Sequence, residues 1–222
     1  MKLVIPDSLE EITLAEIQEI SKVDDILEQA KVFFNTIVKK DASKFDDTTI
    51  IATLQTALNL WQTTISKEAF KEIGEYKLPK NLMDIRVGHL IELANIEVDQ
   101  YEGLELIAGC LYRKDWNKKF NSDEIIETAY AFRDMGADKA LSASIAYNEL
   151  MVQLRDTFPV LYSNKNEEKE EGRKMYSMLL GLSKDDATKW DAAKNIKVAD
   201  AFIYLETKEI EFQKQKQKQG YI

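Results

Sequence analysis

Two stretches of this 222-residue chain repeat one pattern, 73 residues apart. The segment Ile5–Ile20 aligns with Leu78–Leu93, and four pairs are identical: Pro6/Pro79, Leu9/Leu82, Ile12/Ile85 and Glu19/Glu92. Each copy begins with an apolar residue before a proline, continues with a good helix-capping residue, and enters an apolar stripe at helical spacing. The pattern predicts a chain built from a duplicated helical module.

The match resumes further along the chain. Lys44–Ile51 aligns with Lys119–Ile126 at an offset of 75, and Asp41–Asp46 resembles Asp186–Asp191 at an offset of 145. In each segment an aromatic residue stands beside a helix-capping residue, which is typical of a ring that packs at a helix start while its neighbour caps the helix. We therefore expect Phe45, Phe120 and Trp190 to occupy equivalent positions at three helix starts.

The scarcity of Gly and Pro narrows the fold class. Sandwiches and barrels need many turns, and the chain has only 8 Gly and 3 Pro. We predict an all-α fold of quasi-repeated helix-loop-helix modules, with a small β-hairpin near residues 68–78, where Gly74-Glu75 interrupts apolar and charged residues.

The repeats suggest a division of the chain into three parts. The first helical repeat spans 1–66, the hairpin and second repeat span 67–157, and a charged linker with a C-terminal helical segment, a partial third repeat, spans 158–222. One compact domain is the alternative. The charged stretch 164–174 is either a mobile linker or the solvated start of a helix.

Charge and residue usage limit the function classes. With 30 Lys+Arg against 39 Asp+Glu, the net charge of −9 argues against general nucleic-acid binding. The single Cys110 lies in an apolar run, which favours a core residue in a reducing compartment. Neither a signal peptide nor an apolar membrane span is expected, so we expect synthesis in a cytoplasm.

Few side chains are available for catalysis. The one histidine, His89, has no nucleophile motif beside it, so we expect a structural histidine. Three pairs, Asp24-Asp25, Asp46-Asp47 and Asp185-Asp186, stand at predicted helix starts, where capping is favoured over metal binding. We therefore expect no enzyme activity, no cofactor and no metal site.

Two basic segments are candidates for partner contacts. Residues 112–120 combine basic and aromatic side chains that can contact phosphates or stack on bases. The favoured alternative is a loop whose aromatic side chains pack against two helix ends. The alternating Gln and Lys residues 213–219 are either a solvated helix end or a segment that binds an acidic partner. The candidate partner-binding residues are Tyr112, Arg113, Lys114, Trp116, Lys118, Lys119, Lys214, Lys216 and Lys218.

Three blocks carry a resemblance to a known group. Residues 5–14, 76–85 with 108–113, and 180–190 with 202–206 resemble mostly helical virion-associated proteins of tailed bacteriophages of Bacteroidota hosts, including crAss-like phages. The resemblance implies a head, portal, tail or assembly protein, or a cargo protein carried in the virion. Its partners would be other virion proteins, in multiple copies within a symmetric assembly, and no catalytic residues come with it.

Three hypotheses follow. The first is a non-enzymatic virion protein that acts through protein–protein contacts. The second is a tail-assembly chaperone that binds tape-measure or tail-tube subunits and is absent from the mature particle. The third is a metal-dependent hydrolase or nuclease that uses the Asp pairs.

Overall fold

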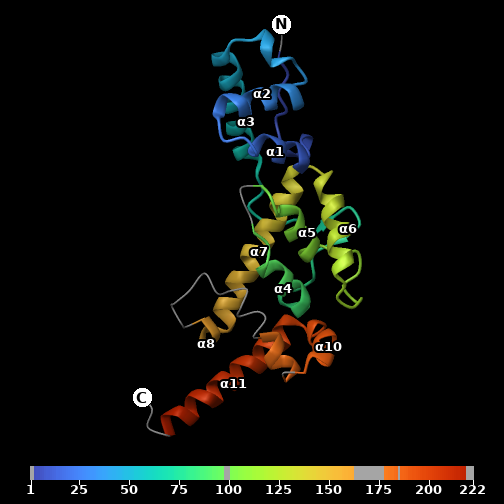
Figure 1. Cartoon of the computed structure of the whole chain (residues 1–222), viewed down its shortest axis with the longest axis vertical. Helices are drawn as coiled ribbons and strands as arrows, with labels where there is room; N and C mark the ends of the chain where they lie inside the picture. Colours follow the sequence, from blue (N-terminus) through green and yellow to red (C-terminus); the bar gives the residue numbers. More distant parts are fainter. Residues whose placement is uncertain (1–2, 98–100, 163–177, 185, 219–222) are drawn as a thin grey trace. The chain divides into compact units, whose positions relative to one another are not determined.

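A computed structural model describes residues 3–97, 101–162, 178–184 and 186–218 (Figure 1). The chain is 66% helical, and the described residues contain one two-stranded antiparallel hairpin, so the predicted all-α fold is confirmed. The hairpin consists of β1 (Glu72–Ile73) and β2 (Tyr76–Lys77), within the predicted range 68–78. Gly74 adopts a φ of 59° in its turn, a conformation that costs glycine little.

The chain forms two compact units whose segments alternate along the sequence. The first unit consists of 1–73, 97–109 and 123–145, and the second of 74–96, 110–122 and 146–222. Three helices, α5 (Leu104–Leu111), α6 (Ser122–Arg133) and α7 (Ala137–Thr157), supply residues to both units. The division of the sequence into 1–66, 67–157 and 158–222 follows the repeats, and it stays a prediction.

The first unit is built around a core of aromatic and aliphatic side chains. Its other elements are the 3-10 turns η1 (Leu9–Glu11) and η2 (Ala42–Lys44) and the helices α1 (Leu14–Ser21), α2 (Ile26–Thr36) and α3 (Asp47–Thr64). Phe33 and Phe34 of α2 are fully buried, and Phe33 meets Trp61 of α3 edge-on at 5.8 Å. The Trp61 indole N–H donates to the carbonyl of Pro6 at 3.1 Å, which ties the N-terminal segment to this core.

The second unit packs helices from both ends of its sequence. Its further elements are η3 (Leu82–Asp84), α4 (Val87–Ala94), α8 (Pro159–Tyr162), η5 (Ala187–Lys189), α10 (Trp190–Lys194) and α11 (Val198–Lys218). Residues 178–183 are also helical. The N-terminal half of α11 packs on α8, η3 and α4, and Phe202 lies 5.4 Å from Phe158.

The predicted repeat is present as a structural motif in both units. The pairs η1/η3 and α1/α4 begin and end at positions 73 residues apart. In the first unit the backbone N–H of Leu14 donates to Met135, and that of Ala137 donates to Ile12. In the second unit, Val87 donates to Ile196 and Val198 donates to Ile85. The repeated unit is therefore a short helix tied by an isolated antiparallel bridge to the start of a longer helix.

The third fragment repeats a local turn. Asp41 accepts hydrogen bonds from the backbone and hydroxyl of Ser43, and Asp186 accepts the same pair from Thr188. Equivalence of the three aromatics holds only in part. Phe45 and Phe120 each stand two residues before a helix, α3 or α6, whereas Trp190 is the first residue of α10 and has helical backbone angles.

Candidate functional site

Two of the candidate partner-binding residues lie inside the fold. Tyr112 is 0% exposed and Arg113 is 3% exposed. After the end of α5, the backbone of Arg113 pairs with that of Lys77. The N–H of Lys77 donates to the carbonyl of Arg113 at 2.9 Å, and the N–H of Arg113 donates to the carbonyl of Lys77 at 3.1 Å. The guanidinium of Arg113 then donates to the carbonyls of Lys118 and Lys119. Both side chains are therefore enclosed within the fold, and a role for them in partner binding stays a prediction.

The remaining residues of this stretch stay at the surface. The ammonium of Lys114 pairs with Glu75 at 2.5 Å and lies 5.3 Å from the centre of the Tyr76 ring. Trp116 is half-buried, and its indole N–H donates to the carbonyl of Lys77 at 2.7 Å. Lys118 and Lys119 are exposed. The contacts of Trp116 fit the structural interpretation of this stretch, in which its aromatic side chains pack against neighbouring elements.

His89 is enclosed by aromatic rings. Its imidazole is 0% exposed and lies 5.0 Å from the Phe120 ring, edge-on, and 5.3 Å from the Trp116 ring. Neither ring nitrogen has a hydrogen-bond partner among the described residues. Burial, together with the nearby cations Arg113 and Arg86, lowers the pKa of His89 to about 3. His89 is therefore a neutral core side chain at physiological pH.

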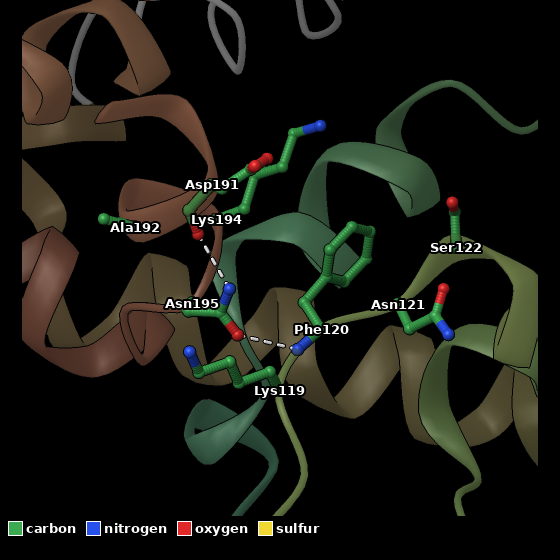
Figure 2. Close-up of a pocket in the computed structure, with 8 residues that line it drawn as sticks. All are labelled: Lys119, Phe120, Asn121, Ser122, Asp191, Ala192, Lys194 and Asn195. Carbon is green, nitrogen blue, oxygen red and sulfur yellow. Dashed lines mark hydrogen bonds between the residues drawn. The ribbon is translucent and has the colours of Figure 1, made fainter. Parts of the chain in front are cut away.

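A pocket of about 630 Å³ opens beside this cluster (Figure 2). It is lined by Lys119, Phe120, Asn121, Ser122, Asp191, Ala192, Lys194 and Asn195. The side-chain oxygen of Asn195 accepts from the backbone N–H of Phe120, and its amide nitrogen donates to the carbonyl of Asp191, both at 2.7 Å. Asn195 thus joins the segment that precedes α6 to α10.

Of the pocket residues, sequence reasoning singled out only Lys119 as a partner-binding candidate. Asn195 was missed because its role is to bridge two backbone groups, and no motif marks an Asn that does so. The lining carries charges of both signs, Lys119 and Lys194 against Asp191. Such a lining suits a polar contact and does not single out one ligand chemistry.

One member of each Asp pair acts as a helix cap. Asp25 accepts from the backbone N–H groups of Leu27 and Glu28, and Asp46 accepts from the N–H and hydroxyl of Thr49. These bonds from Thr49 lower the pKa of Asp46. Asp185 lies outside the described residues, and its neighbour Asp186 caps η5. Among the described residues no group of three or more His, Cys, Asp or Glu side chains is placed to hold a metal ion.

Cys110 is fully buried in α5, as the sequence predicts. Burial raises the pKa of its thiol, and the charge of Glu92 raises it further. Since the thiolate is the reactive form, this thiol is held in its inert state.

The tail of the chain continues α11. The helix extends through Lys218, and Lys214 and Lys216 are exposed. The ammonium of Lys216 lies 4.4 Å from the centre of the Phe212 ring, one turn earlier. The side chain of Lys218 lies outside the described part.

Comparisons with protein-family models, with curated proteins and with solved structures gave no match. In the part of the chain that the structure describes, every helix is too short or too polar to cross a membrane.

Proposed function

We propose that this chain is a non-enzymatic, virion-associated protein of a tailed bacteriophage, which acts through protein–protein contacts in the head–portal–tail assembly. It is either a structural component or a cargo protein carried in the particle. The observation that carries the proposal is that the histidine, the cysteine and three of the paired aspartates are part of the fold itself. His89 and Cys110 are sealed in the core, and the described Asp caps accept backbone N–H groups.

Exposed apolar side chains on two helices support a role in protein contacts. On α6, Ile126 is 47% exposed and Tyr130 is 66% exposed, and their spacing of four residues places them on one helix face. On α11, Ile203 and Phe212 are also exposed. Apolar side chains that share an exposed helix face are suited to contact with another protein. The sequence resemblance to phage virion proteins supplies the biological setting.

Quantitative mass spectrometry of purified particles tests the virion role. We expect the chain in gradient-purified virions at a constant copy number per particle, because a structural or cargo protein is retained. A replication enzyme of the same phage, absent from washed particles, is the matched control. A chain abundant in infected cells and missing from particles would overturn this role and favour the tail-assembly chaperone.

The hydrolase hypothesis is tested by metal binding. Calorimetric titration of the chain with Mg²⁺ and Mn²⁺ should give no saturable heat, since Asp25 and Asp186 already accept backbone N–H groups. A variant with Asp24, Asp25, Asp185 and Asp186 changed to Asn is the control. Saturable binding that this variant loses would contradict the non-enzymatic proposal.

A further inference from the structure

We infer that an apolar pocket of the first unit, lined by α1, α2, α3 and Tyr101, binds one large apolar side chain from a basic segment of a partner protein. The inference deepens the proposed function, on which it rests for its biological setting, by naming the chemistry of the partner. Its test uses the purified chain, so its failure is distinguishable from failure of the virion role, which the composition of particles tests.

The size of the pocket suits a single side chain. Its volume is about 190 Å³, and its apolar lining comes from Ile17, Ile20, Leu54, Leu58, Trp61 and Tyr101. Sites for drug-sized ligands have volumes of about 300–1,000 Å³, whereas an engineered protein cavity of about 150 Å³ binds benzene. The pocket is therefore suited to a group the size of a Leu or Phe side chain.

Polar side chains in the pocket wall already have partners within the chain. The hydroxyl of Ser21 donates to the carbonyl of Gln18 at 3.0 Å, and the amide of Gln18 donates to the carbonyl of Tyr101 at 3.1 Å. The amide of Gln29 donates to the carbonyl of Val23. These hydrogen bonds hold the wall in place before a partner arrives, and they leave mainly apolar surface for it. The pocket is thus preorganised for an apolar group.

The helix that supplies most of the lining is free of charge after its first residue. From Thr48 to Thr64, α3 has no Asp, Glu, Lys or Arg, although these residues make up 31% of the chain. Leu58, in the pocket wall, is 37% exposed. The centres of protein–protein interfaces are depleted of charged residues. An exposed, uncharged helix surface beside an apolar pocket therefore fits the centre of an interface.

The charge of the first unit selects the kind of partner. This unit has 22 Asp and Glu against 10 Lys and Arg, a net charge of −12, whereas the second unit has 17 against 20, a net charge of +3. Opposite charges across an interface favour association, and like charges suppress wrong partners. A segment rich in Lys or Arg is therefore favoured at the pocket. An acidic segment, such as the same unit of a second copy, is disfavoured.

Two exposed carboxylates stand close to pocket residues in the sequence. Asp24 lies between α1 and α2, and Glu102 directly follows Tyr101. Neither carboxylate forms an ion pair with another described residue. The cation in this region, Lys22, lies 3.6 Å from the carboxylate of Glu19, which compensates its charge. Asp24 and Glu102 are thus available to Lys or Arg side chains that flank an apolar anchor in the pocket.

Fluorescence anisotropy with synthetic peptides tests the chemistry of the partner. The probe is a labelled peptide of Ala and Lys with one central Leu, titrated with the purified chain at physiological salt. We expect saturable binding. A peptide with Ser in place of Leu lacks the apolar anchor, and a peptide with Glu in place of Lys has the wrong charge. Each should bind at least about tenfold more weakly.

Two variants of α3 test the pocket itself. Leu58→Arg places a charged side chain in the pocket wall and should weaken binding of the Leu-containing peptide about tenfold. Leu60→Arg is the matched control, because Leu60 is 40% exposed on the same helix but lies on a different face and outside the lining. This variant should bind the peptide as the unaltered chain does. Circular dichroism confirms that both variants are folded.

Neutralisation of the nearby carboxylates tests the charge contribution. The double variant Asp24→Asn and Glu102→Gln should bind the peptide more weakly and with a smaller dependence on salt. The matched control is Glu127→Gln with Asp134→Asn, which removes the same charge from exposed residues of the same unit. It should stay closer to the unaltered chain.

Three results would overturn the inference. The first is the absence of saturable binding of the Leu-containing peptide. The second is equal binding of the Ser-containing peptide, or equal losses in Leu58→Arg and Leu60→Arg, which would mean that the acidic unit attracts cations without use of the pocket. The third is self-association in sedimentation velocity that Leu58→Arg abolishes, since a second copy would then occupy the pocket.

Discussion

The ring of Phe120 lies directly on the backbone of Gly88 in the first turn of α4. A Cβ atom built on Gly88 would lie 2.5 Å from Cγ and Cδ2 of Phe120, closer than real contacts allow. The same ring meets the imidazole of His89 edge-on. The absence of a side chain at position 88 therefore lets the segment before α6 close over α4 and cover His89.

Gly88→Ala should destabilise the protein. Alanine is favoured over glycine within a helix by about 1 kcal/mol. Here the methyl group forces the Phe120 ring to move, and overpacking of this kind costs about 1–3 kcal/mol. Chemical denaturation should therefore show a lower free energy of unfolding for Gly88→Ala.

Gly181→Ala is the matched control for this experiment. A Cβ atom at Gly181 would meet its nearest neighbour, Leu205, at 3.8 Å, an ordinary contact. This variant should be as stable as the unaltered chain or slightly more stable. A Gly88→Ala variant that unfolds no more easily than Gly181→Ala would contradict the close packing of Phe120.

Protonation of His89 should couple stability to pH. The folded pKa, about 3, lies below the ordinary value of 6.5, so the unfolded state binds the proton more readily. The contribution to stability is complete above pH 6.5 and is lost as the pH falls from 6.5 toward 3. Each unit of pKa difference corresponds to about 1.4 kcal/mol, so the full loss amounts to as much as about 5 kcal/mol.

His89→Leu isolates this effect from the titration of carboxylates. At pH 7.5 the variant should be within about 1 kcal/mol of the unaltered chain, because the change removes buried nitrogens that lack a described partner. Below pH 6 it should become the more stable of the two. The measurement is the difference in unfolding free energy between pH 4 and 7.5, and parallel curves would refute the assignment.

The helical repeat could be predicted from the sequence, whereas the bridge that completes it could not. Four identities and a shared apolar stripe located α1 and α4. The partners of these helix starts, Met135–Ala137 and Ile196–Val198, have no identical residue at matching positions. Backbone groups make the bridge, and almost any residue supplies the same N–H and C=O. The sequence therefore carried little signal for it.

Which residues of the basic and aromatic stretch 112–120 are exposed could be predicted from the sequence only in part. An Arg beside Tyr and Trp is equally suited to phosphate oxygens and to backbone carbonyl oxygens, because its guanidinium only donates. In Arg113 the acceptors are the carbonyls of Lys118 and Lys119, which lie in the same chain. Local sequence does not show which oxygen atoms the folded chain places within reach.

Asp46 should stabilise the start of α3 by capping it. Asp46→Ala should lower the denaturation midpoint, because the N–H and hydroxyl of Thr49 lose their acceptor. Asp46→Asn keeps a side-chain oxygen and should lose much less. The bonds from Thr49 lower the folded pKa of Asp46, so the cap is complete above the ordinary value of 3.8 and is lost as the pH falls through the folded pKa.

Replacement of the adjacent Asp47 by Ala gives the comparison. Asp47 carries the same charge one residue later, inside α3, whereas Asp46 is the N-cap. A general effect of negative charge near the helix start would make the two Ala variants alike. Equal midpoints would therefore contradict a specific cap at Asp46.

The residues at the two bridges, Gly136 and Lys197, should respond differently to substitution. They occupy matching places, opposite Thr13 and Arg86. A Cβ atom at Gly136 would lie 2.8 Å from the carbonyl oxygen of Glu10, a backbone atom that cannot easily move. At the second bridge the side chain of Lys197 is accommodated and pairs with Asp84 at 2.9 Å.

Gly136→Ala should therefore lower the free energy of unfolding by about 1–3 kcal/mol, the usual cost of overpacking. Lys197→Ala should lower it by less than about 1 kcal/mol, since it removes one exposed ion pair and leaves the backbone bridge intact. Parallel urea titrations of the two variants measure both values. Equal losses in the two variants would contradict the different packing of the two bridges. A Gly136→Ala variant as stable as the unaltered chain would contradict the close approach of Glu10 to Gly136.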